Sequence, residues 1–342
     1  MTKHVPNKAL PSFAARPPRI VIVGAGALGS ALGGTLALHG ADVWLVTRNA
    51  AHRQAMADHG LFLVSAQDET VARPGVAASC KEIAGAPADI VIILCKSANT
   101  AEAAHDALSV AGPETTILSL QNGMGHEHVL ADIFGAKRVI GGKTYAGGVM
   151  LAPGRVQASV AGKDTIIGEI SQTDPLNDPM RSATIAAQLT GYGMPCKASP
   201  NMVGAIWDKL LINVATGALT ALTRMTYGEI CADPALACVA LSAVAEAMEV
   251  AKARSVTLSI TSPEQAWAMA RAGLPDSFRT SMLQTLEKGQ RSEVDFINGA
   301  VVREGEQVGI ATPVNRLLTA CIHGVETSRA FAIIDCSGRQ RV

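Results

Sequence analysis

The stretch Ile20-Val21-Ile22-Val23-Gly24-Ala25-Gly26-Ala27-Leu28-Gly29 decides the fold of this 342-residue chain. It begins with an apolar, largely β-branched run that is typical of a buried parallel strand. Glycines follow in the spacing G-x-G-x-x-G, and the residues from there to Gly40 have the character of a helix. A second apolar run at residues 42–47 completes a strand–helix–strand unit of about 30 residues. In this context the glycine pattern indicates a dinucleotide site.

The chemistry expected at this glycine turn is that of its backbone. Gly24 permits the tight turn, Gly26 lets the main chain approach a pyrophosphate, and Gly29 lets the helix pack on the strand. The amino terminus of the helix faces the anion with unpaired N–H groups. An ordinary glycine-rich turn is the alternative, but the agreement of motif and context favours dinucleotide binding. We therefore predict that the whole turn contacts the cofactor: Gly24, Ala25, Gly26, Ala27, Leu28 and Gly29.

The end of the second strand indicates which dinucleotide is bound. A site for NAD has an Asp or Glu there, which binds the ribose 2′-hydroxyl. This sequence has Thr47-Arg48-Asn49 instead, without a carboxylate. The planar guanidinium of Arg48 can hold a 2′-phosphate, which an acid would repel. The predicted cofactor is therefore NADP(H), with Arg48 as its phosphate ligand and Arg53 as a weaker helper; a solvated surface arginine is the alternative.

Alternating strand and helix patterns continue as far as residue 195. They predict an α/β fold, a doubly wound and largely parallel sheet of the Rossmann type. Strands are expected at residues 62–64, 89–95, 116–120 and 138–141, with helices at 100–111 and 126–134. Residues 155–158 and 165–168 look like further strands at the edge of that sheet.

Helical periodicity replaces the strand patterns after about residue 195, which predicts an all-α helical C-terminal domain. Its helices are expected at residues 202–223, 234–253, 263–271, 276–288, 292–309 and 313–330. Proline at the start of several of them is typical of a first helical turn. The predicted organisation is a disordered N-terminal extension at 1–18, an NADP-binding Rossmann domain at 19–197 and a helical substrate and catalytic domain at 198–335.

Composition excludes several classes of protein. Lys plus Arg and Asp plus Glu both number 29, so the basic excess that a nucleic-acid binder needs is absent. Hydrophobic residues make up 48% and charged residues 17%, which excludes a disordered chain. The seven cysteines are odd in number and show no CxxC spacing, which favours a reducing cytoplasm over a disulfide framework or a zinc site.

Two local patterns suggest a membrane segment and a metal site, and we favour neither. Residues 20–38 carry no charge over about one membrane-spanning length, but five glycines interrupt them, so no membrane segment is predicted. His126-Glu127-His128 could suggest a metal site, but alternate residues diverge on a helix, and helical metal pairs are spaced i, i+4. We interpret this triplet as the exposed start of a helix and predict no metal.

Two lysines are candidates for chemistry. Lys96 follows an apolar strand, at the carboxyl edge of the sheet where ligands collect in open α/β folds. Lys209 lies in an apolar helix, where Asn213 and Gly217 share its face at four-residue spacing. A lysine on an interior face usually has a task or a partner. The alternative is a lysine whose stem is buried while its ammonium reaches water.

Glu293 is the expected partner of Lys209. In the predicted helix at 292–309 it shares an apolar face with Phe296, Ile297 and Ala300. The alternative is a first-turn glutamate that the helix dipole favours. A lysine, with an ordinary pKa of about 10.4, stays protonated unless burial lowers that pKa strongly, and a nearby carboxylate opposes such lowering.

From Ile20 to about Thr327 the chain resembles the ketopantoate reductases (2-dehydropantoate 2-reductases). The glycine motif is common to many dehydrogenases, whereas the ordered set of the other matching pieces is specific. The matching pieces are Gly24-Ala25-Gly26-Ala27-Leu28-Gly29, Lys96, Leu120-Gln121-Asn122-Gly123, Pro153-Gly154, Trp207-Asp208-Lys209-Leu210 with Asn213, Ser281-Met282-Leu283-Gln284, Glu293 and Asn298-Gly299.

The resemblance implies a Rossmann domain and a helical domain with the active site between them. The implied activity is NADPH-dependent reduction of 2-dehydropantoate (ketopantoate), a small 2-keto acid, to (R)-pantoate, a step toward pantothenate and coenzyme A. Lys209 would be the general acid, and Glu293 would orient Lys209 or a substrate hydroxyl. The implied substrate-binding residues are Lys96, Asn122, Asn213 and Ser281, of which Lys96 and Asn122 would also lie near the nicotinamide.

Two positions depart from the family pattern. Gly217 stands where the family usually has a second asparagine, and Thr285 where it often has an acid. Because Gly217 opens space beside the lysine stripe, a reductase of a different branched 2-keto acid is an alternative. A non-catalytic NADPH-binding sensor is another, although a sensor needs neither Lys209 nor Glu293. Composition leaves a homodimer open.

Overall fold

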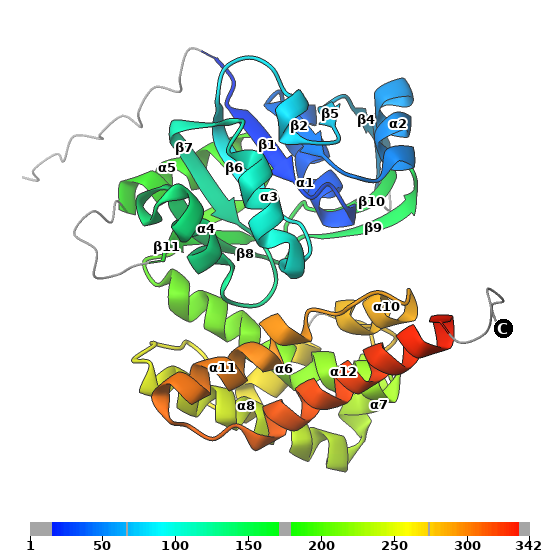
Figure 1. Cartoon of the computed structure of the whole chain (residues 1–342), viewed down its shortest axis with the longest axis vertical. Helices are drawn as coiled ribbons and strands as arrows, with labels where there is room; N and C mark the ends of the chain where they lie inside the picture. Colours follow the sequence, from blue (N-terminus) through cyan, green and yellow to red (C-terminus); the bar gives the residue numbers. More distant parts are fainter. Residues whose placement is uncertain (1–15, 66–67, 171–178, 273, 335–342) are drawn as a thin grey trace, which may run out of the picture.

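The chain folds into a sheet-containing half and a helical half, stacked along the long axis of the molecule (Figure 1). The computed structural model describes residues 16–65, 68–170, 179–272 and 274–334. Residues 1–15 of the predicted N-terminal extension therefore lie outside the described residues. Just after them, the guanidinium of Arg16 pairs with the carboxylate of Asp89 at 2.8 Å.

The main sheet has the strand order β12-β11-β8-β7-β6-β1-β2-β5. All neighbours pair in parallel except β8 and β11, which are antiparallel. This mostly parallel sheet confirms the predicted fold class. Its strands are β1 (Arg19–Val23), β2 (Asp42–Val46), β5 (Gly75–Ala77), β6 (Ala88–Ile93), β7 (Ala111–Ser119), β8 (Val139–Thr144), β11 (Thr165–Glu169) and β12 (Cys196–Ala198).

Helices cover both faces of this sheet because the side chains of its central strands point alternately to two apolar cores. Ile20 and Ile22 pack with α1 (Ala27–Leu38) and α5 (Pro179–Gly191) on one face. Val21 and Val23 pack with α3 (Thr100–Ala107) and α4 (His126–Phe134) on the other. A sheet buried on both faces leaves its carboxyl edge as the open place for a ligand.

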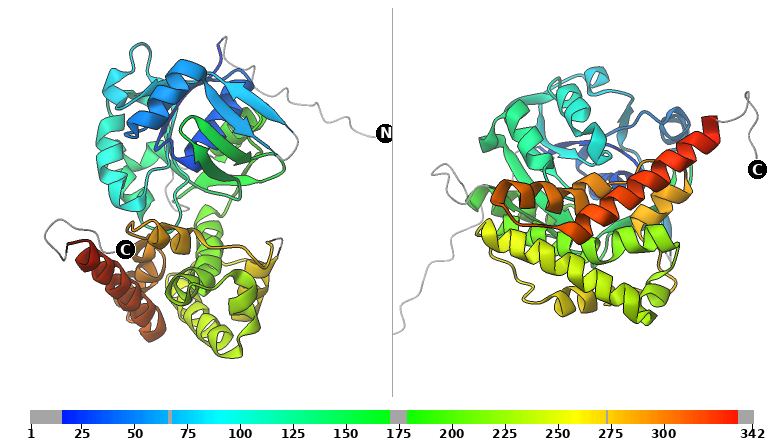
Figure 2. Two further views of the ribbon diagram at one scale, coloured as in Figure 1. Left: turned by 90° about the vertical axis from the view of Figure 1, so that its right-hand side faces the viewer. Right: turned by 60° about the horizontal axis from the view of Figure 1, so that its bottom comes forward.

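A second, smaller sheet lies beside the main one in the same half of the molecule (Figure 2). Its order is β4 (Glu69–Ala72), β3 (Leu61–Val64), β10 (Arg155–Ser159) and β9 (Gly147–Ala152). We expected residues 155–158 at the edge of the main sheet, and that was wrong. β10 pairs instead with β3, so that Leu63 and Val156 are buried against α1. Helix α2 (Ala50–His59) connects β2 to this sheet.

The helical half is built around α6, whose second half is almost wholly buried. Three of its helices have the predicted bounds, namely α6 (Met202–Thr223), α8 (Pro234–Ala253) and α9 (Pro263–Arg271). The others are α7 (Tyr227–Ala232), α10 (Ser281–Glu287), α11 (Asn298–Val308) and α12 (Pro313–Ile334), the last running across the face of this half in Figure 2. The change from strands to helices falls between the end of β12 at Ala198 and the start of α6 at Met202.

Three predicted helices were too long. The helix expected at 100–111 ends at Ala107, because β7 begins soon afterwards at Ala111. The one expected at 276–288 begins at Ser281, because the carbonyl groups of Asp276 and Phe278 accept hydrogen bonds from the N–H groups of Gly228 and Tyr227. The one expected at 292–309 is broken, as described with the site below.

Within the described residues, α6 and α8 are long and apolar enough to cross a membrane by length and composition alone. Buried core helices pass the same test, and 67% of the most apolar window of α6 is buried inside the helical half. For α8 that share is 33%.

Candidate active site

The carboxyl ends of the main-sheet strands meet the helical half at a large cavity. The cavity has a volume of about 920 Å³, which is within the range of small-molecule and cofactor sites. The sheet half lines it with the glycine turn and the residues that follow β2, β6 and β7, and the helical half with α10 and Glu293. The predicted residues that line it are Gly24, Ala25, Gly26, Ala27, Leu28, Gly29, Arg48, Lys96, Asn122, Ser281 and Glu293.

The glycine turn has little room for side chains except toward this cavity. Gly24 has a φ of +108°, and a Cβ added to it would meet the backbone N of Cys95 at 2.3 Å. A Cβ on Gly29 would meet the carbonyl oxygen of Gly24 at 2.4 Å. At Gly26, the residue before α1, a Cβ would meet nothing within 4 Å. The open side of the turn is therefore the start of α1, where helix N–H groups can hold a phosphate.

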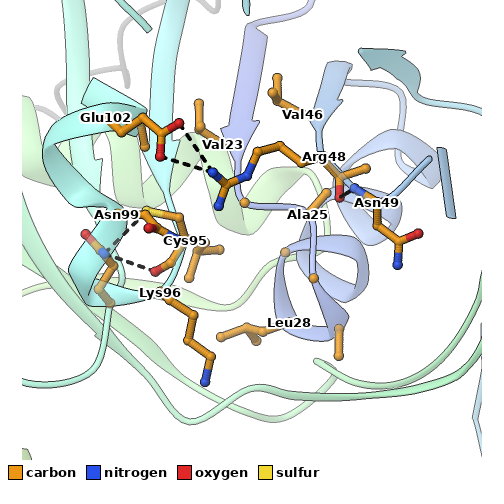
Figure 3. Close-up of a pocket in the computed structure, with 18 of the residues that line it drawn as sticks. Val23, Ala25, Leu28, Val46, Arg48, Asn49, Cys95, Lys96, Asn99 and Glu102 are labelled. Carbon is orange, nitrogen blue, oxygen red and sulfur yellow. Dashed lines mark hydrogen bonds and ion pairs between the residues drawn. The ribbon is translucent and has the colours of Figure 1, made fainter. Parts of the chain in front are cut away.

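Arg48 lies at the end of β2 and points toward Glu102 on α3 (Figure 3). The guanidinium and the carboxylate form an ion pair at 3.0 Å, and both side chains are about two-thirds exposed. An exposed pair of this kind contributes roughly 0–1 kcal/mol, so a phosphate can compete for the arginine. Arg53, the expected helper, donates to the carbonyl of Thr47 and does not line the cavity.

Contacts across the two halves tie the residues after β6 to the helical half. The Lys96 ammonium donates to the Thr285 hydroxyl at 3.1 Å, so the partner of this lysine is a neutral hydroxyl and not a carboxylate. The hydroxyl of Ser97 donates to the Glu293 carboxylate at 2.6 Å, and the backbone N–H of Ser97 donates to the same oxygen at 3.2 Å. Glu293 is thereby fixed at the carboxyl edge of the sheet.

Glu293 does not sit on the helix face that we predicted. It precedes a 3-10 turn, Val294–Phe296, and α11 begins only at Asn298 after a break at Ile297 (φ −114°, ψ −93°). The break holds because the carbonyl of Phe296 accepts a hydrogen bond from the N–H of Met124 at 2.9 Å instead of continuing a helix. A tertiary contact with the other half of the molecule therefore overrides the helical periodicity.

The start of α4 is buried, which corrects our interpretation of the His126-Glu127-His128 triplet. His126 is 0% exposed and its ring stacks on Phe296 with a centroid distance of 5.1 Å. Burial lowers the pKa of His126 to about 4 and raises the pKa of Glu127 to about 7. Across the residues that the structure describes, no group of three or more His, Cys, Asp or Glu could hold a metal ion.

Lys209 reaches from α6 to the end of β8. Its ammonium donates to the carbonyl oxygen of Thr144 at 2.9 Å. The pKa of Lys209 is lowered to about 8, chiefly by burial and also by the positive charge of Lys143, while the negative charge of Glu293 opposes the lowering. An ammonium with a pKa near 8 can donate its proton at neutral pH much more readily than an ordinary lysine.

The structure does not bring every predicted residue to the cavity wall. Lys209 and Asn213 are not among the residues that line it, although Glu293 beside Lys209 is. Gly217 is buried, and a Cβ there would meet the Cε of Met282 at 3.3 Å. Gly217 therefore faces the packing of α10 and gives no support for a wider substrate space.

Sequence reasoning missed two lysines. Lys81, after β5, lines the cavity together with Arg48. Lys143 lies in β8, is 7% exposed and affects the pKa of Lys209. The signal for Lys143 was a lysine inside an apolar strand pattern, but our predicted strand stopped at residue 141. Lys81 has no comparable signal in the sequence, because its segment has the pattern of an ordinary polar turn.

Fold and site define the class of protein: an oxidoreductase that uses a nicotinamide dinucleotide. The open amino terminus of α1 and the size of the cavity fit such a cofactor. The ternary structure of D-mandelate dehydrogenase with NADH and anilino(oxo)acetate is similar, with a TM-score of 0.83 and 25% identity over 91% of this chain and 99% of that one.

The chain belongs to the ketopantoate reductase family. The family model for ketopantoate reductase PanE/ApbA matches residues 20–172, and the model for its C-terminal part matches residues 201–326. The 2-dehydropantoate 2-reductase of Halobacterium salinarum is 35% identical over 88% of this chain and 96% of its own length. That of Archaeoglobus fulgidus is 33% identical over 91% and 99%. The crystal structure of a PanE/ApbA family ketopantoate reductase from Ralstonia eutropha JMP134 has a TM-score of 0.81 and 30% identity, over 91% of this chain and 99% of that one.

Proposed function

We propose that this protein reduces 2-dehydropantoate to pantoate with NADPH, and that Lys209 is its general acid. The observation that carries the proposal is the ammonium of Lys209, held at the carboxyl edge of the sheet with a pKa of about 8 and with Glu293 nearby. Family membership and the 2-dehydropantoate 2-reductase names of the relatives support the substrate.

The residues of the cavity suggest a division of roles. NADPH supplies the hydride, and the glycine turn with Arg48 would hold its phosphates. Hydride arriving at a ketone carbon leaves negative charge on the oxygen, which the Lys209 ammonium stabilises and protonates. Lys96, Asn122 and Ser281 would bind and orient the keto acid, with Asn213 one turn beyond Lys209.

The proposed roles divide along the chain: residues 19–197 would hold the cofactor, and residues 198–335 would supply the acid and part of the substrate site. We also propose a cytoplasmic location, which the six free cysteines among the described residues support. A homodimer stays a prediction.

A panel of 2-keto acids with NADPH and with NADH tests the proposed function directly. We expect 2-dehydropantoate with NADPH to give the highest kcat/KM. A clear preference for another branched 2-keto acid would show that the proposed substrate is wrong but that the proposed reaction class is right. Tight NADPH binding without turnover on any keto acid would identify a sensor and reject the enzyme.

The pH dependence of both reaction directions is expected to report on Lys209. Reduction needs the ammonium, so kcat/KM should fall as pH rises through about 8. Oxidation of pantoate needs the neutral amine, so its kcat/KM should rise through the same pH. The measurement is a pair of pH–rate profiles under subsaturating substrate. Profiles without a transition near this pH would exclude Lys209 as the proton donor.

Cofactor preference is expected to depend on Arg48. In Arg48→Gln the KM for NADPH should rise roughly 10- to 150-fold, because a charge-assisted hydrogen bond to the 2′-phosphate is lost. The KM for NADH should change little. Glu102→Gln is the matched variant: it frees Arg48 and removes a negative charge, so the KM for NADPH should fall. Equal changes in the KM for NADPH and the KM for NADH in Arg48→Gln would show that Arg48 does not discriminate between the two cofactors.

A further inference from the structure

Lys143 is a buried lysine that points from the main sheet toward the helix that carries Lys209. In β8, a Cβ on Gly142 would meet Leu118 and Leu120 of the sheet core, whereas a Cβ on Gly141 would meet Ile206 of α6 at 3.2 Å. Side chains alternate along a strand, so Lys143 lies on the same face as Gly141. It is 7% exposed, and burial lowers its pKa from the ordinary value.

No carboxylate of the described residues forms an ion pair with the Lys143 ammonium. Asp208 of α6 is the acid whose charge favours the protonated form of Lys143. That carboxylate, however, accepts hydrogen bonds from the backbone and hydroxyl of Ser259 and from the N–H of Ile260. Within the described part of the chain, the Lys143 ammonium has no hydrogen-bond acceptor, and its nearest aromatic contact is the ring of Tyr145, 5.7 Å to the centroid.

A second cation beside Lys209 is costly unless an anion joins it. Lys143 lowers the pKa of Lys209, so the two ammonium groups repel each other in a poorly solvated place. Glu293 opposes this effect at Lys209, but its carboxylate is already held by Ser97. Burial of charge is tolerated where the charge is paired. The two acids that act on these lysines, Glu293 and Asp208, accept their hydrogen bonds from other residues, which leaves room for one more negative charge beside the ammonium groups.

The chemistry of a 2-keto acid supplies that charge in the right place. Its carboxylate is bonded directly to the carbonyl carbon, so a site that binds the carbonyl oxygen at one cation needs a second donor close by for the carboxylate. We propose that Lys143 binds the substrate carboxylate while Lys209 contacts the carbonyl oxygen. This proposal rests on the reaction class of the proposed function, the reduction of a 2-keto acid. It does not depend on which 2-keto acid is the substrate.

Oxamate and oxamide are matched probes for this role, because they differ only in that oxamide replaces the carboxylate with a neutral amide. Calorimetric titration of the protein saturated with NADP⁺ should show much tighter binding of oxamate. In Lys143→Gln the affinity for oxamate should fall about 30-fold or more, with little change for oxamide. Lys143→Arg should restore much of the difference. Lys163→Gln, which removes an exposed lysine before β11, is the control and should behave as wild type.

A second readout separates substrate binding from a merely structural role. The groups that act on Lys209 are Lys143 from β8 and Glu293 from the segment before α11. Removing the positive charge in Lys143→Gln should raise the pKa of Lys209 and move the alkaline limb of the reduction profile to higher pH.

Unchanged oxamate affinity in Lys143→Gln, or equal losses for oxamate and oxamide, would overturn the proposal. Equal binding of the two probes by the wild type would also overturn it. Failure of the proposed function has a different signature: no reduction of 2-dehydropantoate by the wild type, whether or not Lys143 discriminates between the probes.

Discussion

Replacing Lys209 with methionine is expected to lower kcat for keto-acid reduction by about 100- to 10,000-fold, the usual contribution of a general acid. Methionine keeps most of the volume of the buried stem, so packing of α6 against β8 should survive. It removes the proton and the positive charge that stabilise the developing alkoxide. It also leaves the carbonyl of Thr144 without the hydrogen bond that it accepts at 2.9 Å.

The measurement is steady-state kinetics together with the affinity for NADPH from the quenching of protein fluorescence. Because Lys209 does not line the cofactor cavity, NADPH affinity should stay close to that of the wild type. Lys163→Met is the control for removal of a lysine charge elsewhere. Turnover near the wild-type level in Lys209→Met would show that another group donates the proton.

The sequence predicted the sheet half well, because its signals are local. The glycine motif required a strand before it and a helix after it, and β1 and α1 are both present. Because apolar side chains of β1 point alternately to both faces of the sheet, helices are expected to cover both faces. The second sheet was harder, because β3 and β10 pair over a long sequence separation and are short.

Most of the predicted site residues line the cavity, whereas the geometry predicted for Glu293 was wrong. Glu293 was chosen for an apolar helix face that does not exist, and it reaches the site through a 3-10 turn held by a contact with Met124. Lys143 was missed because the predicted strand stopped at residue 141 and because the sequence does not show which face of β8 meets α6. Tertiary contacts of this kind leave no periodic signal in a single sequence.

Replacing Glu293 with glutamine is expected to reduce kcat/KM roughly 10- to 150-fold at pH 8, since the negative charge near Lys209 is lost and the hydrogen bonds from Ser97 are no longer charge-assisted. The negative charge of Glu293 opposes the lowering of the Lys209 pKa, so its removal should lower that pKa further. Less of the enzyme then carries the ammonium at a given pH. The alkaline limb of the reduction profile should therefore move to lower pH, opposite to the shift expected for Lys143→Gln.

The matched control is Ser97→Ala, which removes the hydroxyl that donates to Glu293 at 2.6 Å but leaves the carboxylate charged. If Glu293 acts by its charge, Ser97→Ala should lower kcat modestly and leave the limb in place, and Glu293→Asp should recover part of the activity. A limb that does not move in Glu293→Gln, combined with a loss of kcat equal to that of Ser97→Ala, would show instead that Glu293 only positions the segment after β6. The two opposite shifts at Lys209, from Glu293 and from Lys143, together test whether these two charges set the proton affinity of the acid.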